Sequence, residues 1–385
     1  MKESQKVLFV SHTANFAKFN RPFMRDLREK GVVVHYASAG EEEVLDCDKH
    51  FEIGFARSPF RVLKNGKAYR ELKKLLKKED YDLIHCHTPV GGVLARVAAR
   101  GLARKRHYDE PGEEAKRPKV IYTAHGFHFY EGGPKRSWLL YYPVEKNLAK
   151  DTDCLITINT EDFKLARKKF AAKRTVRLDG VGVDLAKFGP VTEAKKEKLR
   201  AKHGLAKGDF VLIYVAELNK NKDQDFLLKA LPGLKREIPK LKLLLVGTGT
   251  EEARLKQLAQ KMGLGETVEF LGYRQDVAEL YQLADVGVST SRREGLGLGL
   301  VEEMASGLPV VARDNRGHRE VVATEQQGRL FKDKEGLIKA VLELYRSPKL
   351  RAEMGKHNLE VVKKYSSEVA RERMAEIYRE MLRTR

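Results

Sequence analysis

The chain has 385 residues, 42% of them apolar, and apolar segments recur along its whole length, so it can build two domains with cores of their own and is not disordered as a whole. No apolar run approaches the roughly 20 residues of a membrane-spanning helix, and three cysteines without a CxxC pair argue against a disulfide scaffold or a structural zinc site and favour a reducing cytoplasm. The 74 Lys and Arg against 54 Asp and Glu give a formal net charge of +20, spread over both halves, which attracts polyanions such as nucleic acid, anionic lipid headgroups or phosphate-bearing substrates.

Short apolar strands alternate with amphipathic helical stretches from one end of the chain to the other. Strands of near-continuous Val, Ile and Leu, separated by helices, are typical of parallel sheets covered on both faces. The first series of predicted strands is Val7–Ser11, Val32–Ala37, Leu83–His87, Val120–Ala124 and Cys154–Ile158. The second series is Val211–Val215, Leu241–Val246, Val268–Leu271, Val286–Thr290 and Pro309–Ala312.

The stretch Leu178–Asp184 interrupts this alternation and marks the predicted domain boundary. We therefore predict two doubly wound α/β domains, residues 1–180 and 181–365, facing a central cleft at the carboxyl ends of their strands, where ligands bind in such folds. A charged helix over 366–385 has apolar residues on one face and is expected to pack back on the first domain. Residues 104–118 are all polar or breaker residues and are predicted to form a mobile surface insertion.

The segment Arg57–Lys78 holds nine basic residues and one acid, Glu71. At 100° per residue, one face of a helix over this segment is cationic and the opposite face is apolar. The cations of that face are Lys67, Arg70, Lys74 and Lys77. Such a ridge is expected to attach reversibly to an anionic membrane surface, at about 1 kcal/mol per cation, and the alternative is an ordinary solvated helix face.

Histidines gather near the ends of predicted strands in the first half: His12, His85, His87, His125 and His128. Four of these five fall at or just beyond the carboxyl end of a strand, where ligands bind. Lone histidines are usually structural, but clustering at one sheet edge favours ligand contact. The pattern lacks the close pair and carboxylate of zinc hydrolases, so we predict no metal site there.

The most informative segment is Thr290–Val311, which reads TSRREGLGLGLVEEMASGLPVV. A predicted strand ends near Thr290, a loop with three glycines follows, and a helix then runs through Val301. Backbone amides of such a loop can close on a phosphate, and the helix dipole favours its negative charge. Glu294 and Glu302 flank the loop, and a carboxylate suits a sugar because it accepts two hydroxyl hydrogen bonds. The alternative is that both glutamates are solvated and the glycines only make a turn.

The spacing of Glu294 and Glu302, inside EGLGLGLVEEM and before SGLPVV, resembles the signature of retaining GT-B glycosyltransferases, in particular glycosyltransferase family 4. Further segments are similar to its capsular and exopolysaccharide branch: 47–61, 81–92, 120–130, 152–159, 216–224 and 316–322. The resemblance covers nearly the whole chain in order. It implies the GT-B fold, with a first domain that binds the acceptor and a second that binds a nucleotide sugar, a UDP-sugar being favoured.

The resemblance also implies roles for single residues of the second domain. Glu302 would hold the ribose hydroxyls of the nucleotide, and Glu294 would meet hydroxyls of the donor sugar. The amides that would bind the diphosphate or the sugar beside it belong to Gly295, Leu296, Gly297 and Leu298. Lys222 would neutralise the departing diphosphate, which gains charge in the transition state.

Two more segments of the second domain are candidates for nucleotide contacts. The loop Gly272–Asp276 is similar to the family segment that brackets the base, so Tyr273 and Arg274 could stack on it or contact its edge. The turn at Thr248 and Gly249, after a predicted strand, could approach the nucleotide. For the first of these loops, an ordinary surface loop is an equally open interpretation.

In the first domain, the resemblance places His125 where the family contacts the transferred sugar near the anomeric centre. His12, Thr13 and Asn15 stand in place of the family's first glycine-rich loop near the acceptor, although the glycines are absent. His87, at the end of a neighbouring strand, is added as a further acceptor-binding candidate.

One departure from the family concerns the diphosphate. Glu217 stands where the family commonly has a phosphate-binding arginine, so either Lys220 or Arg274 substitutes for it, or Lys222 and backbone amides hold the diphosphate alone. No DxD-like pair lies at a strand end of the catalytic segment, which agrees with an enzyme that needs no metal or other cofactor. The implied mechanism is retention: the acceptor hydroxyl attacks the face that the diphosphate leaves, and the leaving phosphate takes the proton.

Together these features predict a peripheral enzyme at the cytoplasmic face of the membrane, acting on a lipid-linked or polysaccharide acceptor. A basic nucleic-acid-binding protein is the alternative from a different class, but the chain lacks a recognition motif, and that interpretation leaves the paired glutamates unexplained. We therefore expect no nucleic-acid partner. A nucleotide-sugar epimerase or a phosphorylase on the same fold also stays open: the first would convert UDP-N-acetylglucosamine without an acceptor, and the second would hold a pyridoxal cofactor.

Overall fold

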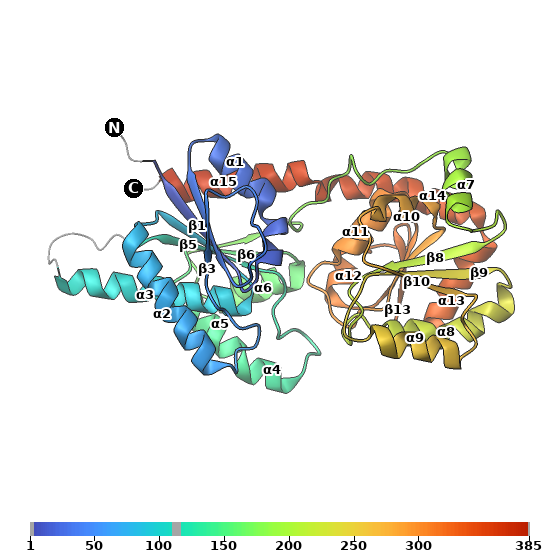
Figure 1. Ribbon diagram of the computed structural model, residues 1–385, viewed down its shortest axis with the longest axis horizontal. Helices are drawn as coiled ribbons and strands as arrows, with labels where there is room; N and C mark the ends of the chain where they lie inside the picture. The colour runs from blue at the N-terminus through green and yellow to red at the C-terminus, as the bar shows by residue number, and fades with distance from the viewer. Residues whose placement is uncertain (1–3, 110–116, 384–385) are drawn as a thin grey trace. The chain divides into compact units, whose positions relative to one another are not determined.

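The computed structural model describes residues 4–109 and 117–383, and the side chains within them except those of 103–109. The chain divides into two compact units, Met1–Gly182 with Ser367–Arg385, and Val183–Ser366. Each unit has its own parallel sheet with helices around it (Figure 1). This confirms the predicted doubly wound α/β architecture. Within the described ranges, every helix is too short or too polar to span a bilayer.

The sheet of the first unit has seven strands in the order β3-β2-β1-β4-β5-β6-β7. They are β1 (Lys6–Val10), β2 (Val33–Ser38), β3 (Lys49–Glu52), β4 (Leu83–His87), β5 (Lys119–Ala124), β6 (Cys154–Thr157) and β7 (Arg174–Arg177). Strand order reverses between β1 and β4, and the carboxyl end of a sheet at such a reversal is the usual ligand position.

Helices cover both faces of this sheet, because successive residues of its strands point to opposite sides. Along β1, Val7 and Phe9 join one apolar cluster, whereas Leu8 and Val10 join the other. The first cluster is covered by η1 (Ala14–Phe19), α1 (Arg21–Glu29) and α15 (Ser367–Arg383). The second is covered by α2 (Val62–Glu79), α3 (Pro89–Asp109), α4 (Lys135–Leu140), α5 (Tyr142–Ala149) and α6 (Thr160–Lys169). Tyr378 of α15 is buried in the first cluster, so the last helix belongs to the first unit.

The end of α3 corrects one expectation. Residues 104–109 continue this helix, so the surface insertion expected over 104–118 does not begin before residue 110. Arg and Lys have good helix propensity, and the first breaker residues of the segment, Pro111 and Gly112, come after the helix. The part of the predicted insertion over 110–116 lies outside the described residues.

The sheet of the second unit has six strands in the order β10-β9-β8-β11-β12-β13. They are β8 (Phe210–Val215), β9 (Leu241–Val246), β10 (Val268–Gly272), β11 (Val286–Ser289), β12 (Val310–Arg313) and β13 (Gly328–Phe331). The helices are α7 (Glu193–Lys202), α8 (Gln224–Glu237), α9 (Glu252–Lys261), α10 (Val277–Leu283), α11 (Leu298–Ala305), α12 (Arg316–Val321), α13 (Lys334–Arg346) and α14 (Pro348–Val361), followed by η2 (Val362–Tyr365). Strand order reverses between β8 and β11, which places the loops after these two strands side by side.

Candidate active site

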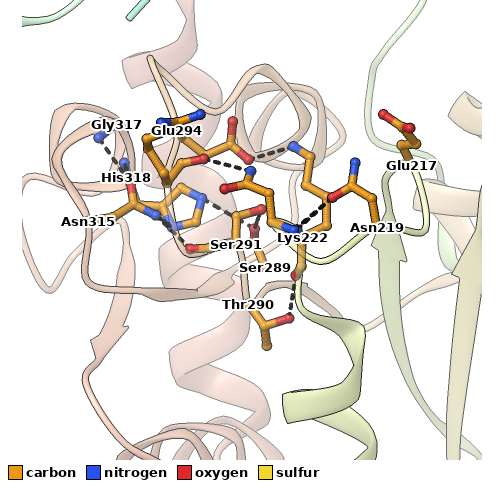
Figure 2. Close-up of polar contacts among 12 residues, drawn as sticks. Glu217, Asn219, Lys222, Ser289, Thr290, Ser291, Glu294, Asn315, Gly317 and His318 are labelled. Carbon is orange, nitrogen blue, oxygen red and sulfur yellow. Dashed lines mark hydrogen bonds and ion pairs between the residues drawn. The ribbon is translucent and has the colours of Figure 1, made fainter. Parts of the chain in front are cut away.

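The candidate active site lies at the carboxyl edge of the second sheet. Lys222 belongs to the loop after β8, and Glu294 to the loop after β11. In Figure 2 the two side chains point toward one another, and Nζ of Lys222 lies 2.5 Å from Oε1 of Glu294. Two residues 72 positions apart in the chain thus form one ion pair where the strand order reverses.

The backbone of Lys222 is held from several sides. Oδ1 of Asn219 accepts a hydrogen bond from the N–H of Lys222 at 3.0 Å. The hydroxyls of Tyr214 and Thr290 donate to the Lys222 carbonyl at 2.8 and 2.9 Å. Tyr214 lies in β8 and Thr290 directly follows β11, so hydrogen bonds from both strands next to the site fix this carbonyl. The lysine side chain therefore starts from a fixed point.

The environment of the ion pair keeps both partners charged. Burial alone would lower the pKa of Lys222, but the neighbouring Glu294 carboxylate outweighs it and raises that pKa. Burial alone would raise the pKa of Glu294, but the Lys222 ammonium outweighs it and leaves that pKa below its ordinary value. The side chains are still 27% and 16% exposed, so both can reach a ligand. The site thus presents a fixed cation beside a fixed carboxylate.

The segment after β12 packs against Glu294, and Figure 2 shows its residues Asn315, Gly317 and His318 beside that side chain. Asn315 caps α12 by accepting hydrogen bonds from the N–H groups of Gly317 and His318, and its amide donates to the Ser291 carbonyl at 2.9 Å. A Cβ at Gly317 would lie 2.7 Å from the Cβ of Glu294, so only glycine allows this approach. Residues 316–322, one of the segments that resemble the family, therefore pack against the site.

His318 links that segment to β11. It is buried, and burial lowers its pKa to about 4, so the ring is neutral near pH 7. Its Nδ1 lies 2.7 Å from the Arg313 carbonyl, which can only accept, so Nδ1 carries the proton. Nε2 is then the acceptor for the Ser289 hydroxyl, 3.2 Å away. Sequence analysis missed His318, Asn315 and Ser289, and only the resemblance of 316–322 pointed to this part of the chain.

The glycine loop leads into α11 as the sequence predicts. Gly297 has a φ of +98°, a left-handed conformation that glycine adopts without strain, and a Cβ there would lie 3.1 Å from the His318 ring. Helix α11 begins at Leu298, with no acidic residue in its first turn. Leu296 points into the protein and is buried, so its possible ligand contact is through the backbone. Gly295 lies between Glu294 and Leu296 at the opening of the loop.

Helix α11 carries two adjacent glutamates in different environments. Glu302 is half-buried, and the Tyr281 hydroxyl donates to its Oε2 at 3.2 Å. Glu303 is buried against Gly287 of β11, and burial, with the nearby Glu302 charge, raises its pKa well above the ordinary value. Of the two glutamates, Glu302 is therefore the one whose side chain is partly exposed. Tyr281, its hydrogen-bond donor, was not among the predicted residues.

The other predicted donor residues lie after β9 and β10. Arg274 is tied to Asp276 by hydrogen bonds of 2.7 and 2.5 Å, and this contact lowers the pKa of Asp276 to about 2. Tyr273 is 75% exposed, so its ring is accessible from solvent. Gly249 packs against the backbone of Leu218, so its turn lies beside the loop that carries Lys222, and Thr248 is exposed at its start.

The residues around the missing arginine can also be placed. Glu217 and Lys220 are both exposed in the loop after β8, and Figure 2 draws no polar contact from the Glu217 carboxylate. A buried carboxylate that sequence analysis missed, Asp223, organises the base of this loop. It has a φ of +54° and binds Arg292 at 2.9 Å and Arg313 at 2.7 Å. These two contacts join the loop after β8 to the segments after β11 and at the end of β12.

In the first unit, three of the predicted histidines come together. His85 lies between the Tyr378 hydroxyl at 2.7 Å and the Thr123 hydroxyl at 2.8 Å, and burial lowers its pKa to about 3. Nδ1 of His87 lies 3.1 Å from Nε2 of His125. His128 instead packs against Tyr141, with ring centroids 4.8 Å apart.

The other first-domain candidates lie in the loop after β1. The backbone N–H of His12 donates to the Thr88 hydroxyl at 3.2 Å, and burial together with Arg57 lowers the pKa of the His12 ring. Thr13 precedes η1, and its carbonyl accepts from Ser11, while the side chain of Asn15 donates to Glu42 at 3.0 Å. These residues share the switch-point edge of the sheet with the end of β4.

Helix α2 has the two faces that its sequence predicts. Its apolar side is buried in the core of the first unit. Its exposed side includes Lys67, Arg70, Lys74 and Lys77. The start of the helix adds a feature that sequence analysis missed, because the apolar side chains of Phe60, Val62 and Leu63 are 70%, 71% and 90% exposed. This end of α2 combines apolar and cationic groups at the surface.

Two family models match the chain, one for each unit. "Glycosyl transferase 4-like" matches residues 6–159, and "Glycosyl transferases group 1" matches residues 195–361. EpsD of Bacillus subtilis (strain 168), which carries a provisional glycosyltransferase name, is 42% identical over 379 residues, covering 97% of this chain and 96% of its own.

One further relative and one solved structure are also similar to this chain. A UDP-Gal:alpha-D-GlcNAc-diphosphoundecaprenol alpha-1,3-galactosyltransferase of Escherichia coli is 31% identical over 289 residues, covering 73% of this chain and 70% of its own. The structure of HepE from Anabaena in complex with UDP-glucose superposes with a TM-score of 0.77 at 20% identity, over 97% of this chain and 99% of that one, and so supports the fold. With a GT-B fold, matched family models and an EpsD-like relative along nearly its whole length, the chain belongs to the GT-B glycosyltransferases of family 4, which act on nucleotide sugars.

Proposed function

We propose that this protein is a retaining, metal-independent glycosyltransferase that moves a hexosyl group from a UDP-sugar to a lipid-linked or polysaccharide acceptor. The observation that carries the proposal is the Lys222–Glu294 ion pair at the glycine loop that leads to Glu302. A nucleotide sugar needs partners for a ribose, a diphosphate and a sugar, and this edge of the sheet supplies a carboxylate, a cation and a second carboxylate in that order.

Each group then has a defined task. Glu302, oriented by Tyr281, accepts the ribose hydroxyls. The loop amides and Lys222 hold the diphosphate, and Glu294 accepts hydroxyls of the sugar. An ammonium has three N–H groups, so Lys222 can keep its bond to Glu294 and still donate to a phosphate oxygen.

The reaction that we propose breaks the bond between the anomeric carbon and the diphosphate oxygen and forms one from that carbon to the acceptor oxygen on the same face. The acceptor proton passes to the leaving phosphate. A double displacement would use a free carboxylate as nucleophile, whereas Glu294 is held by Lys222, which lowers its pKa and its nucleophilicity. Charge stabilisation by preorganised groups supplies the rate.

Lys222 provides at this site the positive charge that a divalent metal would otherwise supply. The structure does bring together three potential metal ligands elsewhere in its described part, His203, Asp276 and Glu279. Their carboxylates are already neutralised, Asp276 by Arg274 at 2.5 Å and Glu279 by Lys202 at 2.9 Å. We therefore route no step through this cluster.

Donor and acceptor classes follow from chemistry together with the relatives. The Escherichia coli enzyme is named for transfer from UDP-Gal to a diphosphoundecaprenol-linked sugar, and HepE was solved with UDP and with UDP-glucose. A lipid-linked acceptor lies at a membrane surface, and α2 offers exposed cations, with the exposed apolar residues Val62 and Leu63 in its first turn and Phe60 just before it. We place the protein at the inner face of the cell membrane, attached through the cationic face of α2 and the exposed apolar residues at its start.

The test is a thermal-shift screen with UDP- and GDP-sugars on the wild type, Glu302→Ala and Glu303→Gln. Glu303 is buried, and burial raises its pKa well above the ordinary value, so its amide variant is a matched control one residue away. We expect a UDP-sugar to stabilise the wild type and Glu303→Gln, and to lose most of that effect in Glu302→Ala. Unchanged melting of the wild type with every donor would contradict the donor assignment.

Once a donor has been identified, the reaction product tests the proposed mechanism. The anomeric configuration of the product, read by NMR, tests retention, and a rate that survives a metal chelator tests metal independence. Inversion, or a rate that is lost and then restored by Mg²⁺, would overturn the corresponding part of the proposal. Conversion of UDP-N-acetylglucosamine without an acceptor would instead identify an epimerase.

A further inference from the structure

We propose that His87 is a positioning residue, which fixes the ring of His125 so that its Nδ1–H faces outward as a hydrogen-bond donor. The proposal rests on the proposed function only for the ligand that receives this hydrogen bond, a hydroxyl or other oxygen of a sugar. His87 was predicted as an acceptor contact, but it is 1% exposed, and among the described residues its ring forms one hydrogen bond, to His125.

Strand pairing places the two rings. His87 is the last residue of β4 and pairs with Thr123 of β5, two residues before His125. Phe16 packs edge-on against the His125 ring with centroids 4.8 Å apart, and Phe9 lies parallel to the His87 ring at 6.2 Å. These contacts hold both rings while Nδ1 of His87 lies 3.1 Å from Nε2 of His125.

A single proton lies between those two nitrogens, because both rings are neutral near pH 7. Burial lowers the pKa of His125 to about 4, and burial with the neighbouring histidines takes the pKa of His87 well below its ordinary value. The third ring of the group, His85, uses both of its nitrogens in hydrogen bonds to the hydroxyls of Tyr378 and Thr123, so neither nitrogen bonds to His87. The remaining question is which ring donates.

The environment of Nε2 of His87 shows which of the two rings donates the hydrogen bond. Nε2 of His87 is buried, and it has no hydrogen-bond partner in the described part of the structure. If His125 were the donor, His87 would carry its own proton on Nε2, as a buried N–H without a partner, and orphaned N–H groups are rarer than orphaned acceptors. His87 therefore donates from Nδ1, and His125 accepts at Nε2.

A neutral imidazole carries one proton, so His125 must then be protonated at Nδ1. In the described residues, His125 has no polar atom that is both buried and without a partner, and its ring is half-buried. Its Nδ1 is therefore accessible to a ligand. The one lone pair of the ring is already used by His87. His125 can therefore donate to a sugar oxygen but cannot act as a general base, which leaves the acceptor proton to the departing phosphate.

The experiment reads the tautomer directly. In protein labelled with ¹⁵N-histidine, long-range ¹H–¹⁵N correlations separate protonated from unprotonated ring nitrogens, and a His125→Asn variant assigns the His125 signals. We expect Nδ1 of His125 to be protonated in the wild type. A wild-type His125 protonated at Nε2 would overturn the proposal without the need for any variant.

Two substitutions test whether His87 sets this state. His87→Phe keeps a ring and deletes the donor, whereas His87→Asn can place an amide N–H near the position of Nδ1. We expect His125 to lose its single tautomer in His87→Phe and to keep it in His87→Asn. An unchanged His125 spectrum in His87→Phe would refute the positioning role.

Kinetics add a readout that a loss of folding would not mimic. For donor turnover we expect His87→Phe to lower kcat about tenfold with little change in the KM for the donor, since one hydrogen bond is lost, and His87→Asn to recover most of the rate. Equal kcat in both variants and the wild type would also overturn the proposal. The NMR measurement needs no substrate, so an absence of nucleotide-sugar binding would refute the proposed function and leave this inference standing.

Discussion

Replacement of Lys222 by methionine should destabilise the second unit. It removes the cation and leaves the Glu294 carboxylate, which is 16% exposed, without its ion-pair partner. Breaking a fully buried pair costs about 3–5 kcal/mol, and the remaining exposure of both groups reduces this to about 2 kcal/mol. For a unit of this size, that corresponds to a drop in melting temperature of about 4–8 °C.

The effect should depend on pH in a defined direction. Since the folded protein holds the pKa of Glu294 below the ordinary value of 4.5, the ion pair stabilises above that value, and the contribution is lost as the pH falls through the lowered pKa. The raised pKa of Lys222 means that the contribution is also lost at alkaline pH, as the pH rises through it. The difference between wild type and Lys222→Met should thus be full at pH 7 and shrink below the ordinary glutamate pKa.

Differential scanning calorimetry without ligand measures this, with Lys220→Met as control, since Lys220 is an exposed lysine of the same loop. Glu294→Gln and the double variant complete a double-mutant cycle. We expect the double variant to be more stable than the sum of the single losses implies, because neither charge is left unpaired. Strictly additive losses, or a Lys222→Met protein that melts with the wild type, would refute the argument.

Two further outcomes follow from the geometry. Gly317→Ala should weaken UDP binding at least about tenfold, because its Cβ would lie 2.7 Å from the Cβ of Glu294. Gly299→Ala is the control and should not weaken binding, because its Cβ would meet only the Val215 carbonyl at 3.6 Å. Calorimetric titration compares the two variants, and equal affinities for UDP would contradict the role of Gly317. Lys67→Glu with Lys74→Glu removes two cations and adds two anions, so it should lower binding to vesicles that contain an anionic phospholipid by at least about 2 kcal/mol, or roughly thirtyfold. Lys334→Glu with Lys349→Glu changes the net charge equally and should not lower binding. An equal loss in both pairs, measured by flotation, would assign the effect to net charge instead of α2.

The strands of both sheets show what a local pattern can predict. All ten predicted strands are present, because buried parallel strands are continuous apolar runs. The strands that were missed, β3, β7 and β13, lie at sheet edges and include exposed or half-buried residues such as Lys49, Arg174 and Arg329. Their pairing partners decide their conformation, and a local pattern does not contain that information.

The site shows the same division between local chemistry and long-range packing. Lys222, Glu294 and Glu302 could be proposed because their side chains match the chemistry of a charged sugar donor. The contacts that hold these side chains in place could not be proposed from the sequence. Asp223, for example, contacts Arg313, which is 90 positions away, and only the sheet brings the two together. Likewise, the burial of His87 depends on packing by Phe9 and Phe16 from other elements.

The most direct test of the central claim is a crystal structure of the protein with UDP bound. We predict that the ribose hydroxyls contact the Glu302 carboxylate and that the diphosphate contacts Lys222 and the loop around Gly297. A nucleotide bound anywhere else on the second unit, with Glu302 and Lys222 both unengaged, would contradict the account.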